Sequence, residues 1–303
     1  MELDFTNLSA LVCEAGRQGV PLSQLVLEQQ ARQAEQEPEV LYRRMRDQYA
    51  VMAQAVCAGS EKGVRSTSGL TGGDGYRMQQ AARNGGLTGP VFTGALARAL
   101  AVSEWNAAMG RIVAAPTAGS CGILPAAVLT MQQERQIPER DCVMSLFTAA
   151  AVGLVIAHNA TLSGAQGGCQ AECGSASAMA AAALVELGGG TPAMAEQAVA
   201  IALKNTLGLV CDPVAGLVEI PCIKRNAAGV ANALCAAELA LAGIQSAIPA
   251  DEVIQAMKRV GDAMPAALRE TAEGGLATTP TGRKLFEQVF GTPGGCQGCG
   301  CNQ

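Results

Sequence analysis

Apolar residues recur at helical spacing along most of the chain, and this pattern predicts three helices before residue 60. The first begins near residue 5, where Thr6 or Asn7 has the short polar side chain that caps a helix start. The second is predicted over 21–37 and the third over 38–58. None of them carries a catalytic pattern, so the N-terminal part, residues 1–58, is interpreted as helical scaffold.

Glycine and hydroxyl side chains interrupt the helical pattern over residues 59–89. Within this region the segment 66–76 (STSGLTGGDGY) is too rich in both to form a regular element, and its glycines allow the backbone to approach a ligand closely. Farther along, long apolar helices alternate with short loops rich in glycine and proline. These loops are predicted over 115–122, 162–174, 207–221 and 271–282.

The period-two alternation that is typical of strands is scarce in this chain. We therefore predict an all-α fold with a single large helical domain over residues 1–290, in which the Gly-rich loops converge. The remaining residues, 291–303, form a Cys/Gly-rich stretch that we expect to be a flexible tail. No internal repeat divides the chain into smaller units.

Composition agrees with closely packed helices and argues against several partners. Apolar residues make up 49% of the chain and aromatic residues only 3%, so alanine, leucine and valine supply the core. The net charge of −5 leaves no basic surface for nucleic acid. The most apolar stretch, 143–157, is shorter than the roughly 20 residues of a membrane span. We predict that it is a buried core helix and that the protein has no membrane partner.

Cysteine usage and the start of the chain bear on the compartment. The sequence holds twelve cysteines, and it begins with the acidic stretch MELDF where a secretory signal would be basic. Free thiols on this scale favour a reducing environment. A chain of 303 residues also has no need of disulfides to build a stable core. We therefore expect a cytoplasmic protein.

Three cysteines in the middle of the chain, Cys169, Cys211 and Cys222, lie beside glycine, proline or polar turns. A thiolate that holds a metal needs this backbone freedom, whereas a buried structural cysteine does not. The spacings of 42 and 11 residues are not those of a compact ferredoxin or zinc ribbon. From spacing alone, a dispersed metal centre and unrelated buried cysteines remain equal alternatives.

Longer segments around these cysteines closely resemble the alpha chain of the iron–sulfur-dependent L-serine dehydratases (L-serine deaminases) of the two-subunit type. Shorter matches early and late in the chain extend the resemblance over almost the whole sequence. The segments are 68–73 (SGLTGG), 115–125 (APTAGSCGILP), 159–172 (NATLSGAQGGCQAE), 207–218 (LGLVCDPVAGLV), 221–226 (PCIKRN), 268–271 (LRET) and 279–282 (TPTG).

The resemblance implies that Cys169, Cys211 and Cys222 hold a 4Fe–4S cluster, on which the Gly-rich loops converge. It also implies an L-serine ammonia-lyase, in which the hydroxyl of L-serine leaves from the open iron and the product hydrolyses to pyruvate and ammonia. No pyridoxal phosphate is expected, because no lysine has a convincing setting for it. Lys62, which lies nearest a Gly-rich loop, is the only one of interest.

The remaining cysteines are interpreted by their surroundings. One tail cysteine is expected to cap the open iron, with Cys301 slightly favoured over Cys299 and Cys296, although the tail does not end in cysteine. Cys173 follows Cys169 at helical spacing, so it would share a face with that ligand; we favour a packing role for it and for Cys121. Core thiols are predicted in apolar helical contexts at Cys13, Cys57, Cys142 and Cys235.

Serine is a zwitterion, so its site needs donors for a carboxylate and an acceptor for an ammonium. Residues 117–119 precede a helix predicted to begin near Ile123, where backbone N–H groups suit the carboxylate. Asp74 is a possible ammonium partner. The expected substrate contacts are Ser66, Ser68, Thr71, Gly72, Gly73, Asp74, Thr117, Ala118, Gly119 and Asn159, with Ser163, Arg225 and Asn226 as further possibilities. For the 66–74 loop, a plain turn and helix cap is the alternative.

The reaction also needs a base that takes the α proton of the substrate. Ser68, Thr117 and Asn159 are the candidate catalytic side chains, but none is an obvious base. His158 is the single histidine in the chain, and a lone histidine after an apolar run usually ends a helix. If the family uses a histidine, we expect it to come from a beta chain.

Alternative functions also fit these patterns. The same centre would serve β-elimination from L-cysteine or L-threonine. A non-enzymatic redox sensor would need the cluster but not the Ser/Thr/Gly loops, and a structural zinc protein would need the thiols alone.

Overall fold

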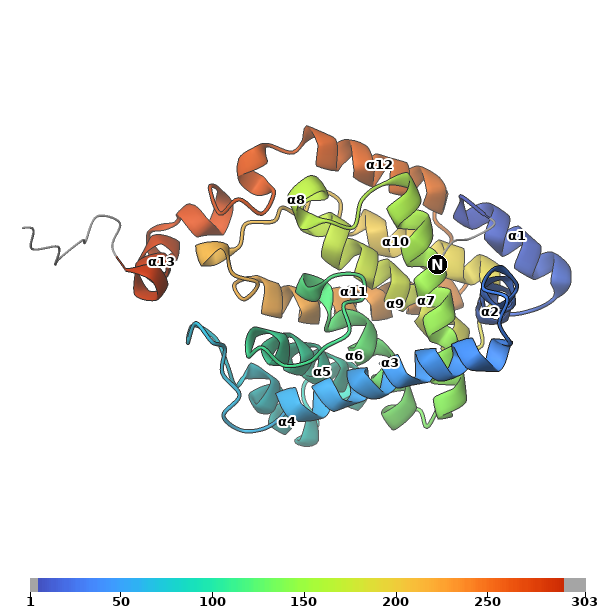
Figure 1. Cartoon of the computed structure of the whole chain (residues 1–303), viewed down its shortest axis with the longest axis horizontal. Coiled ribbons are helices and arrows are strands. Elements are labelled where there is room, and N and C mark those ends of the chain that lie inside the picture. The colour runs from blue at the N-terminus through green and yellow to red at the C-terminus, as the bar shows by residue number, and fades with distance from the viewer. Residues whose placement is uncertain (1–4, 292–303) are drawn as a thin grey trace, which may run out of the picture.

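The computed structural model describes residues 5–291, which form α-helices joined by loops and short helical turns, without a strand in this range (Figure 1). The predicted all-α fold is therefore confirmed. The helices are α1 (Leu8–Gln18), α2 (Leu22–Gln33), α3 (Pro38–Gly59), α4 (Asp74–Arg83), α5 (Gly89–Ala107), α6 (Ile123–Glu134), α7 (Glu139–Asn159), α8 (Gly164–Gly167), α9 (Ser175–Leu187), α10 (Pro192–Lys204), α11 (Cys222–Leu241), α12 (Ala250–Ala263) and α13 (Pro280–Phe290).

The first helices form where the hydrophobic pattern predicts them. Asn7 caps α1, because its side-chain oxygen accepts a hydrogen bond of 2.8 Å from the N–H of Ala10. Asp251 at the start of α12 accepts a second one, also 2.8 Å long, from the N–H of Leu8. Proline at the first position of α3 fixes the start of that helix at Pro38. The N-terminal part is thus tied to the body of the fold.

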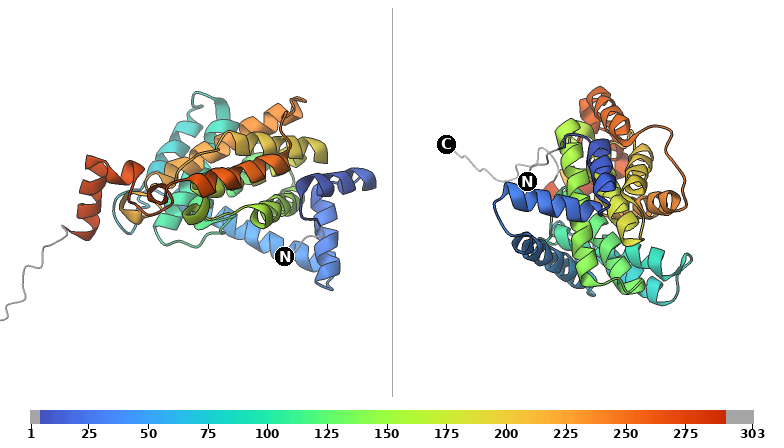
Figure 2. Two further views of the ribbon diagram at one scale, coloured as in Figure 1. Left: turned by 90° about the horizontal axis from the view of Figure 1, so that it is seen from above. Right: turned by 90° about the vertical axis from the view of Figure 1, so that its right-hand side faces the viewer.

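Helix α9 lies at the centre of the molecule, packed against α6, α7, α10 and α11 (Figure 1). Its sequence, SASAMAAAALVEL, is so rich in alanine that neighbouring helix axes approach closely on every side. Helices α1 and α2 lie at one end of the molecule and α13 at the other (Figure 2). The helix α13 packs against the turn Val214–Gly216, next to one of the Gly/Pro loops.

Helix α7 contains the apolar stretch 143–157 that the sequence predicts to be a core helix. It is the one described helix that is long and apolar enough to cross a membrane, but 67% of that apolar window is buried inside the fold. Phe147, Val143 and Ile156 are among its fully buried side chains. The predicted core helix is confirmed.

Two predicted loops are shorter than expected. Asp74 and Gly75 already belong to α4, because the buried carboxylate of Glu104 accepts their backbone N–H groups at 2.8 and 2.9 Å and so starts the helix. The predicted loop 162–174 also contains helical turns: α8 and a π-helical turn over Gln170–Gly174. In both cases, hydrogen bonds within the fold outweigh the low helix propensity of glycine.

Three cysteines predicted to be core thiols are exposed. Cys13, Cys57 and Cys235 lie on the solvent side of α1, α3 and α11, whereas Cys142 is buried as predicted. Each of these helices is amphipathic, with one face toward the core and one toward solvent. A cysteine can therefore have apolar neighbours in the sequence and still lie on the solvent face, because its position around the helix axis decides its face.

Candidate active site

The cysteines at positions 169, 211 and 222 are buried, with exposed fractions of 2%, 3% and 7%. Cys169 follows α8, Cys211 lies in the loop after α10, and Cys222 is the first residue of α11. Cys211 and Cys222 both lie near Cys169. The fold therefore brings together three residues that lie far apart in the sequence.

Gln170 joins the first two of these loops. Its fully buried side chain donates a hydrogen bond of 2.9 Å to Met257 O and accepts another of 2.9 Å from the N–H of Gly208. Its own N–H donates to Leu209 O at 3.0 Å. Gly168 before it has φ of +74°, and a Cβ there would lie 2.9 Å from Leu209 O. The chain can make this close turn only with glycine.

A fourth thiol lies next to this group. The Sγ atoms of Cys169 and Cys173 are 3.5 Å apart, on the π-helical turn, so the predicted shared face is confirmed. Hydrogen bonds from Cys173 and Cys211, together with the charge of Arg225, lower the pKa of Cys169, whereas the pKa values of Cys173 and Cys211 are raised.

Arg225 lies within the thiol group and is held in place by the Cys211 loop. Its guanidinium donates hydrogen bonds to Val210 O at 2.7 Å and to Asp212 Oδ1 at 2.9 Å. Asp212 in turn accepts the N–H of Leu276 at 2.8 Å. A fixed positive charge beside buried thiols stabilises their deprotonated form, which is the form that ligates metal.

This donor set fits a polynuclear iron–sulfur group. Among residues 5–291, no three Cys, His, Asp or Glu side chains converge closely enough to hold a single metal ion. Three buried thiols beside the guanidinium of Arg225 are donors of the kind that an iron–sulfur group takes as thiolates, one for each iron. The tail cysteines Cys296, Cys299 and Cys301 lie outside the described residues. The capping role expected for one of them therefore stays a prediction.

The predicted 66–74 loop is anchored on the loop that leads to Cys222. The carboxylate of Glu219, which is 5% exposed, accepts hydrogen bonds from Ser68 Oγ at 3.0 Å and Thr71 Oγ1 at 2.7 Å. Ser66 Oγ lies 3.2 Å from Ser68 Oγ. Gly72 must be glycine, since its φ is +147° and a Cβ would lie 2.5 Å from Val64 O.

Asp74, predicted as a possible ammonium partner, already has two cations beside it. Arg77 Nη2 lies 2.5 Å from Asp74 Oδ1, and Lys224 Nζ lies 3.0 Å from Asp74 Oδ2. Gly73 precedes it in the left-handed region, with φ of +81°. The side chain of Asp74 therefore ties the loop to Lys224 of α11, which lies two residues after Cys222.

The loop at 115–122 is held against the start of α11 by Asn226. This nearly fully buried side chain accepts the N–H of Gly122 at 2.8 Å and donates to Gly119 O at 2.7 Å. Thr117 Oγ1 lies 3.0 Å from Ser120 Oγ. Helix α6 begins at Ile123, as predicted. Ala118 and Gly119 form a short helical turn with Ser120. Gly119 faces Glu172, which follows Cys169, and Val218, in the loop between Cys211 and Cys222.

Sequence reasoning missed Glu172. A Cβ on Gly119 would lie 3.3 Å from both of its carboxylate oxygens, and one on Gly164 would lie 2.7 Å from its Oε2 and 3.1 Å from Cys211 Sγ. Burial raises the pKa of Glu172 to about 7, and the charge of Cys169 adds to this, against a lowering by the hydroxyl of Thr117. The signal available in the sequence was that Glu172 ends the segment 159–172, three residues after Cys169.

Two predicted residues at the end of α7 lie apart from this arrangement. The amide of Asn159 donates to Thr6 O at 2.6 Å and to Val155 O at 2.9 Å, so it joins the end of α7 to the N-terminal segment. His158 is exposed. Ser163 precedes α8, and its carbonyl accepts the N–H groups of Gln166 and Gly167.

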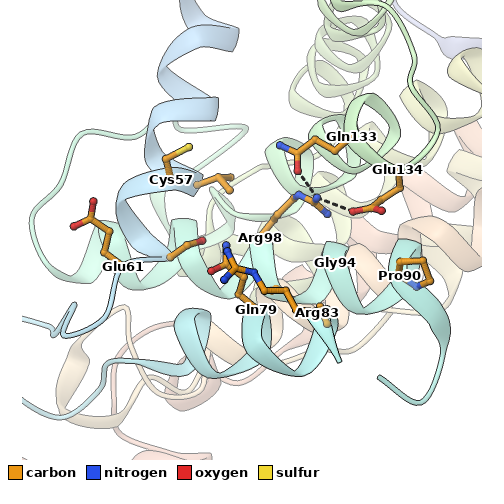
Figure 3. A pocket seen from close by; sticks show the side chains of 13 residues that line it. Cys57, Glu61, Gln79, Arg83, Pro90, Gly94, Arg98, Gln133 and Glu134 are labelled. Carbon is orange, nitrogen blue, oxygen red and sulfur yellow. Dashed lines mark hydrogen bonds and ion pairs between the residues drawn. The ribbon is translucent and has the colours of Figure 1, made fainter. Parts of the chain in front are cut away.

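Open volume alone does not identify the site. Figure 3 shows a pocket of about 650 Å³ between α3, α4, α5 and α6, where Arg98 contacts Gln133 and Glu134. None of its lining residues comes from the loops that bear Cys169, Cys211 or Cys222. A second pocket of about 460 Å³ does adjoin those loops; it is lined in part by Thr161, Ala165, Gln166, Arg269 and Thr271.

Several known proteins are similar to this chain in sequence. A family model described as serine dehydratase alpha chain matches residues 17–277. The chain is 50% identical over 288 residues to a probable L-serine dehydratase alpha chain from Bacillus subtilis, a match that covers 95% of this chain and 96% of the relative. It is 44% identical over 268 residues to an L-serine dehydratase alpha chain from Peptoniphilus asaccharolyticus, covering 88% and 92%.

A longer relative matches over part of its length. The L-serine dehydratase TdcG from Escherichia coli is 48% identical over 181 residues, which are 59% of this chain and 40% of the relative. The helical fold, the motif loops and these matches define an enzyme of the lyase class. More particularly, the chain belongs to the serine dehydratase alpha-chain family.

Proposed function

We propose that this chain is the cluster-bearing alpha chain of an L-serine ammonia-lyase, which converts L-serine to pyruvate and ammonia. One observation carries the proposal: Cys169, Cys211 and Cys222 are buried together, on loops joined to the Ser/Thr/Gly segments of the expected substrate site. The names of the relatives support the same substrate.

In this proposal the three cysteines hold a 4Fe–4S cluster as thiolates. When bound, such a cluster supplies a Lewis acid, at the iron without a protein ligand, for the departing hydroxyl. The chain keeps the ligands in place through Gln170 and keeps a positive charge beside them through Arg225. Burial of the thiols excludes bulk water, which strengthens every charge interaction there.

The two substrate loops are proposed to orient L-serine. The backbone N–H groups of residues 117–119 suit its carboxylate, because they precede a helix and carry partial positive charge. The hydroxyls of Thr117 and Ser68, with Ser66, are proposed to line the expected site. Orientation of this kind lowers the entropy cost of the elimination step.

The base that takes the α proton is proposed to come from a beta chain. Within this sequence the single histidine, His158, has an exposed side chain at the end of α7. The alpha-chain name of the relatives also implies a second subunit. The free thiols found throughout the described residues are compatible with a cytoplasmic location, which stays part of the proposal.

The first test is pyruvate release from L-serine by anaerobically purified protein, with and without the beta chain, while visible absorbance is recorded. We expect a brown protein that forms pyruvate, loses activity in air and depends on the beta chain. A brown protein that is inert in both arms would overturn the lyase assignment for serine. L-cysteine and L-threonine as substrates would then distinguish another β-elimination from a sensor, and a colourless protein with zinc would exclude the cluster.

A ligand variant tests the centre itself. We expect Cys211→Ala to abolish both iron absorbance and turnover, because two thiolates do not retain the cluster. Cys142→Ala is the matched control, since this thiol is equally buried but lies in α7 among apolar residues. Retained iron absorbance in Cys211→Ala would overturn the assignment of that ligand.

The capping role of the tail has a separate test. Truncation after Thr292 removes Cys296, Cys299 and Cys301. We expect the shortened protein to bind the cluster but to lose its visible absorbance faster in air, because the open iron is then unprotected. Single Cys→Ser variants at the three positions would identify the capping residue. A decay rate equal to that of the full chain would remove the capping role.

A further inference from the structure

The acidic side chains around the candidate active site differ in whether an arginine or lysine forms an ion pair with them. Asp74 lies beside Arg77 and Lys224, and Asp212 lies beside Arg225. Within residues 5–291, Glu219 and Glu172 take part in no ion pair, but Glu219 already accepts hydrogen bonds from the hydroxyls of Ser68 and Thr71. In the same range no such anchoring contact is present for Glu172, which is partly buried. A carboxylate in this setting lacks a counter-charge that a ligand would supply.

The position of Glu172 is defined by two glycines and a cysteine. Its carboxylate lies against Gly119 of one predicted substrate loop and against Gly164 at the start of α8, where a Cβ would also contact Cys211. The hydroxyl of Thr117 lies close to this carboxylate. The carboxylate therefore stands where the expected carboxylate-binding loop and the proposed cluster ligands meet.

The local backbone keeps Glu172 in this place. It lies within the π-helical turn Gln170–Gly174, directly after Cys169. Gln170 anchors that turn through hydrogen bonds to Met257 and Gly208, so the turn is fixed at its base. Turns of this type are rare and are frequently found at functional sites, where they redirect a side chain.

From these contacts we propose that Glu172 binds the α-ammonium group of the substrate and so selects amino acids over hydroxy acids. The inference rests on the proposed function, because it takes L-serine to be the substrate. The carboxylate of Glu270 nearby adds a second negative charge, which makes the surroundings still more favourable for a cation. Glu172 thereby takes the role that the sequence suggested for Asp74.

Two unreactive ligands that differ by the ammonium group alone test this assignment. L-alanine carries carboxylate and ammonium but no leaving group, and propanoate carries the carboxylate only. We would measure their dissociation constants by equilibrium dialysis on the cluster-loaded protein with its beta chain. The wild-type enzyme should bind L-alanine more tightly than propanoate.

The decisive variant is Glu172→Gln, which keeps the shape of the side chain and removes its charge. We expect the affinity for L-alanine to fall by about 10-fold or more, as for loss of one partly buried charge-assisted hydrogen bond. The affinity for propanoate should change by less than about 2-fold. Glu196→Gln in α10 is the control, because that carboxylate is half-buried but lies away from the thiols and should leave both constants unchanged.

Other outcomes would overturn the assignment. Equal weakening of both ligands would show that Glu172 merely supports the site, and an undiminished preference for L-alanine would place the ammonium elsewhere. If Glu172→Gln loses its iron absorbance, Glu172→Asp decides: it should keep the preference at lower affinity, and loss of the preference would contradict the proposal. Wild-type protein that forms no pyruvate from L-serine would instead refute the proposed function.

Discussion

Thr71 Oγ1 donates a hydrogen bond of 2.7 Å to Glu219 Oε2, and this contact joins the Gly-rich 66–74 loop to the segment that leads into Cys222. Ser68 donates to the same oxygen at 3.0 Å. Glu219, 148 residues after Thr71 in the sequence, therefore positions a predicted substrate loop against the segment that bears a predicted cluster ligand.

We expect Glu219→Ala to release this loop. Each hydrogen bond to a charged acceptor contributes about 1.5–3 kcal/mol, so loss of two of them should raise the population of the detached loop by at least 10-fold. The measurement is the rate of tryptic cleavage after Arg65, which is exposed and directly precedes the loop. Glu287→Ala on the exposed side of α13 serves as the control. Unchanged cleavage after Arg65 would contradict the anchoring role.

The 3.5 Å separation of the Cys169 and Cys173 sulfurs makes the two thiols easy to confuse, and variants separate them. Cys169→Ala should lose the iron absorbance. Cys173→Ala should retain it and lose stability on the order of 1 kcal/mol, as expected when a buried side chain is shortened. Iron content and thermal unfolding are the two readouts. Loss of iron in Cys173→Ala alone would reverse the assignment.

Glycine at position 164 is required by space rather than by backbone conformation. A methyl group there would lie 2.7 Å from Glu172 Oε2 and 3.1 Å from Cys211 Sγ, so Gly164→Ala should lower iron retention and turnover by 10-fold or more while the fold persists. Gly16→Ala is the matched comparison. No atom lies within 4 Å of the carbon that Gly16→Ala would add. This variant should raise the free energy of unfolding by about 0.5–1 kcal/mol, because alanine favours the helical state of α1. Normal iron content in Gly164→Ala would disprove the steric argument.

Thiol reactivity should follow exposure and pKa. Burial raises the pKa of Cys121 to about 12, while that of Cys142 is raised by burial to about 11. Both thiols therefore stay protonated at pH 8, and iodoacetamide should modify them only after unfolding. The exposed cysteines Cys13, Cys57 and Cys235 should react in the native protein. Peptide mass spectrometry gives the order in which the thiols are labelled. Labelling of Cys121 in the native protein would contradict the prediction.

Local signals in the sequence were sufficient for the first helices and for the core helix α7, but not for the start of α4 or the helical turns within 162–174. The cap at Asn7, the start of α3 at Pro38 and the apolar stretch within α7 were all predictable, because each depends on residues within one or two turns. The exposed cysteines were not predicted correctly. Whether a small residue faces the core depends on the phase of its helix relative to other helices, and that phase is fixed by packing.

For the site, the glycine, proline and polar turns beside Cys169, Cys211 and Cys222 drew attention to these residues but left a metal centre and unrelated buried cysteines as equal alternatives. The resemblance of the flanking motifs to serine dehydratase alpha chains favoured the metal centre. Only the tertiary structure decided how the charges are distributed: that Asp74 is paired with Arg77 and Lys224, that Asn159 closes the end of α7, and that Glu172 lies between two loops. The reason is that the state of a charged side chain depends on which atoms from distant segments surround it, and those distances exist only in the folded chain.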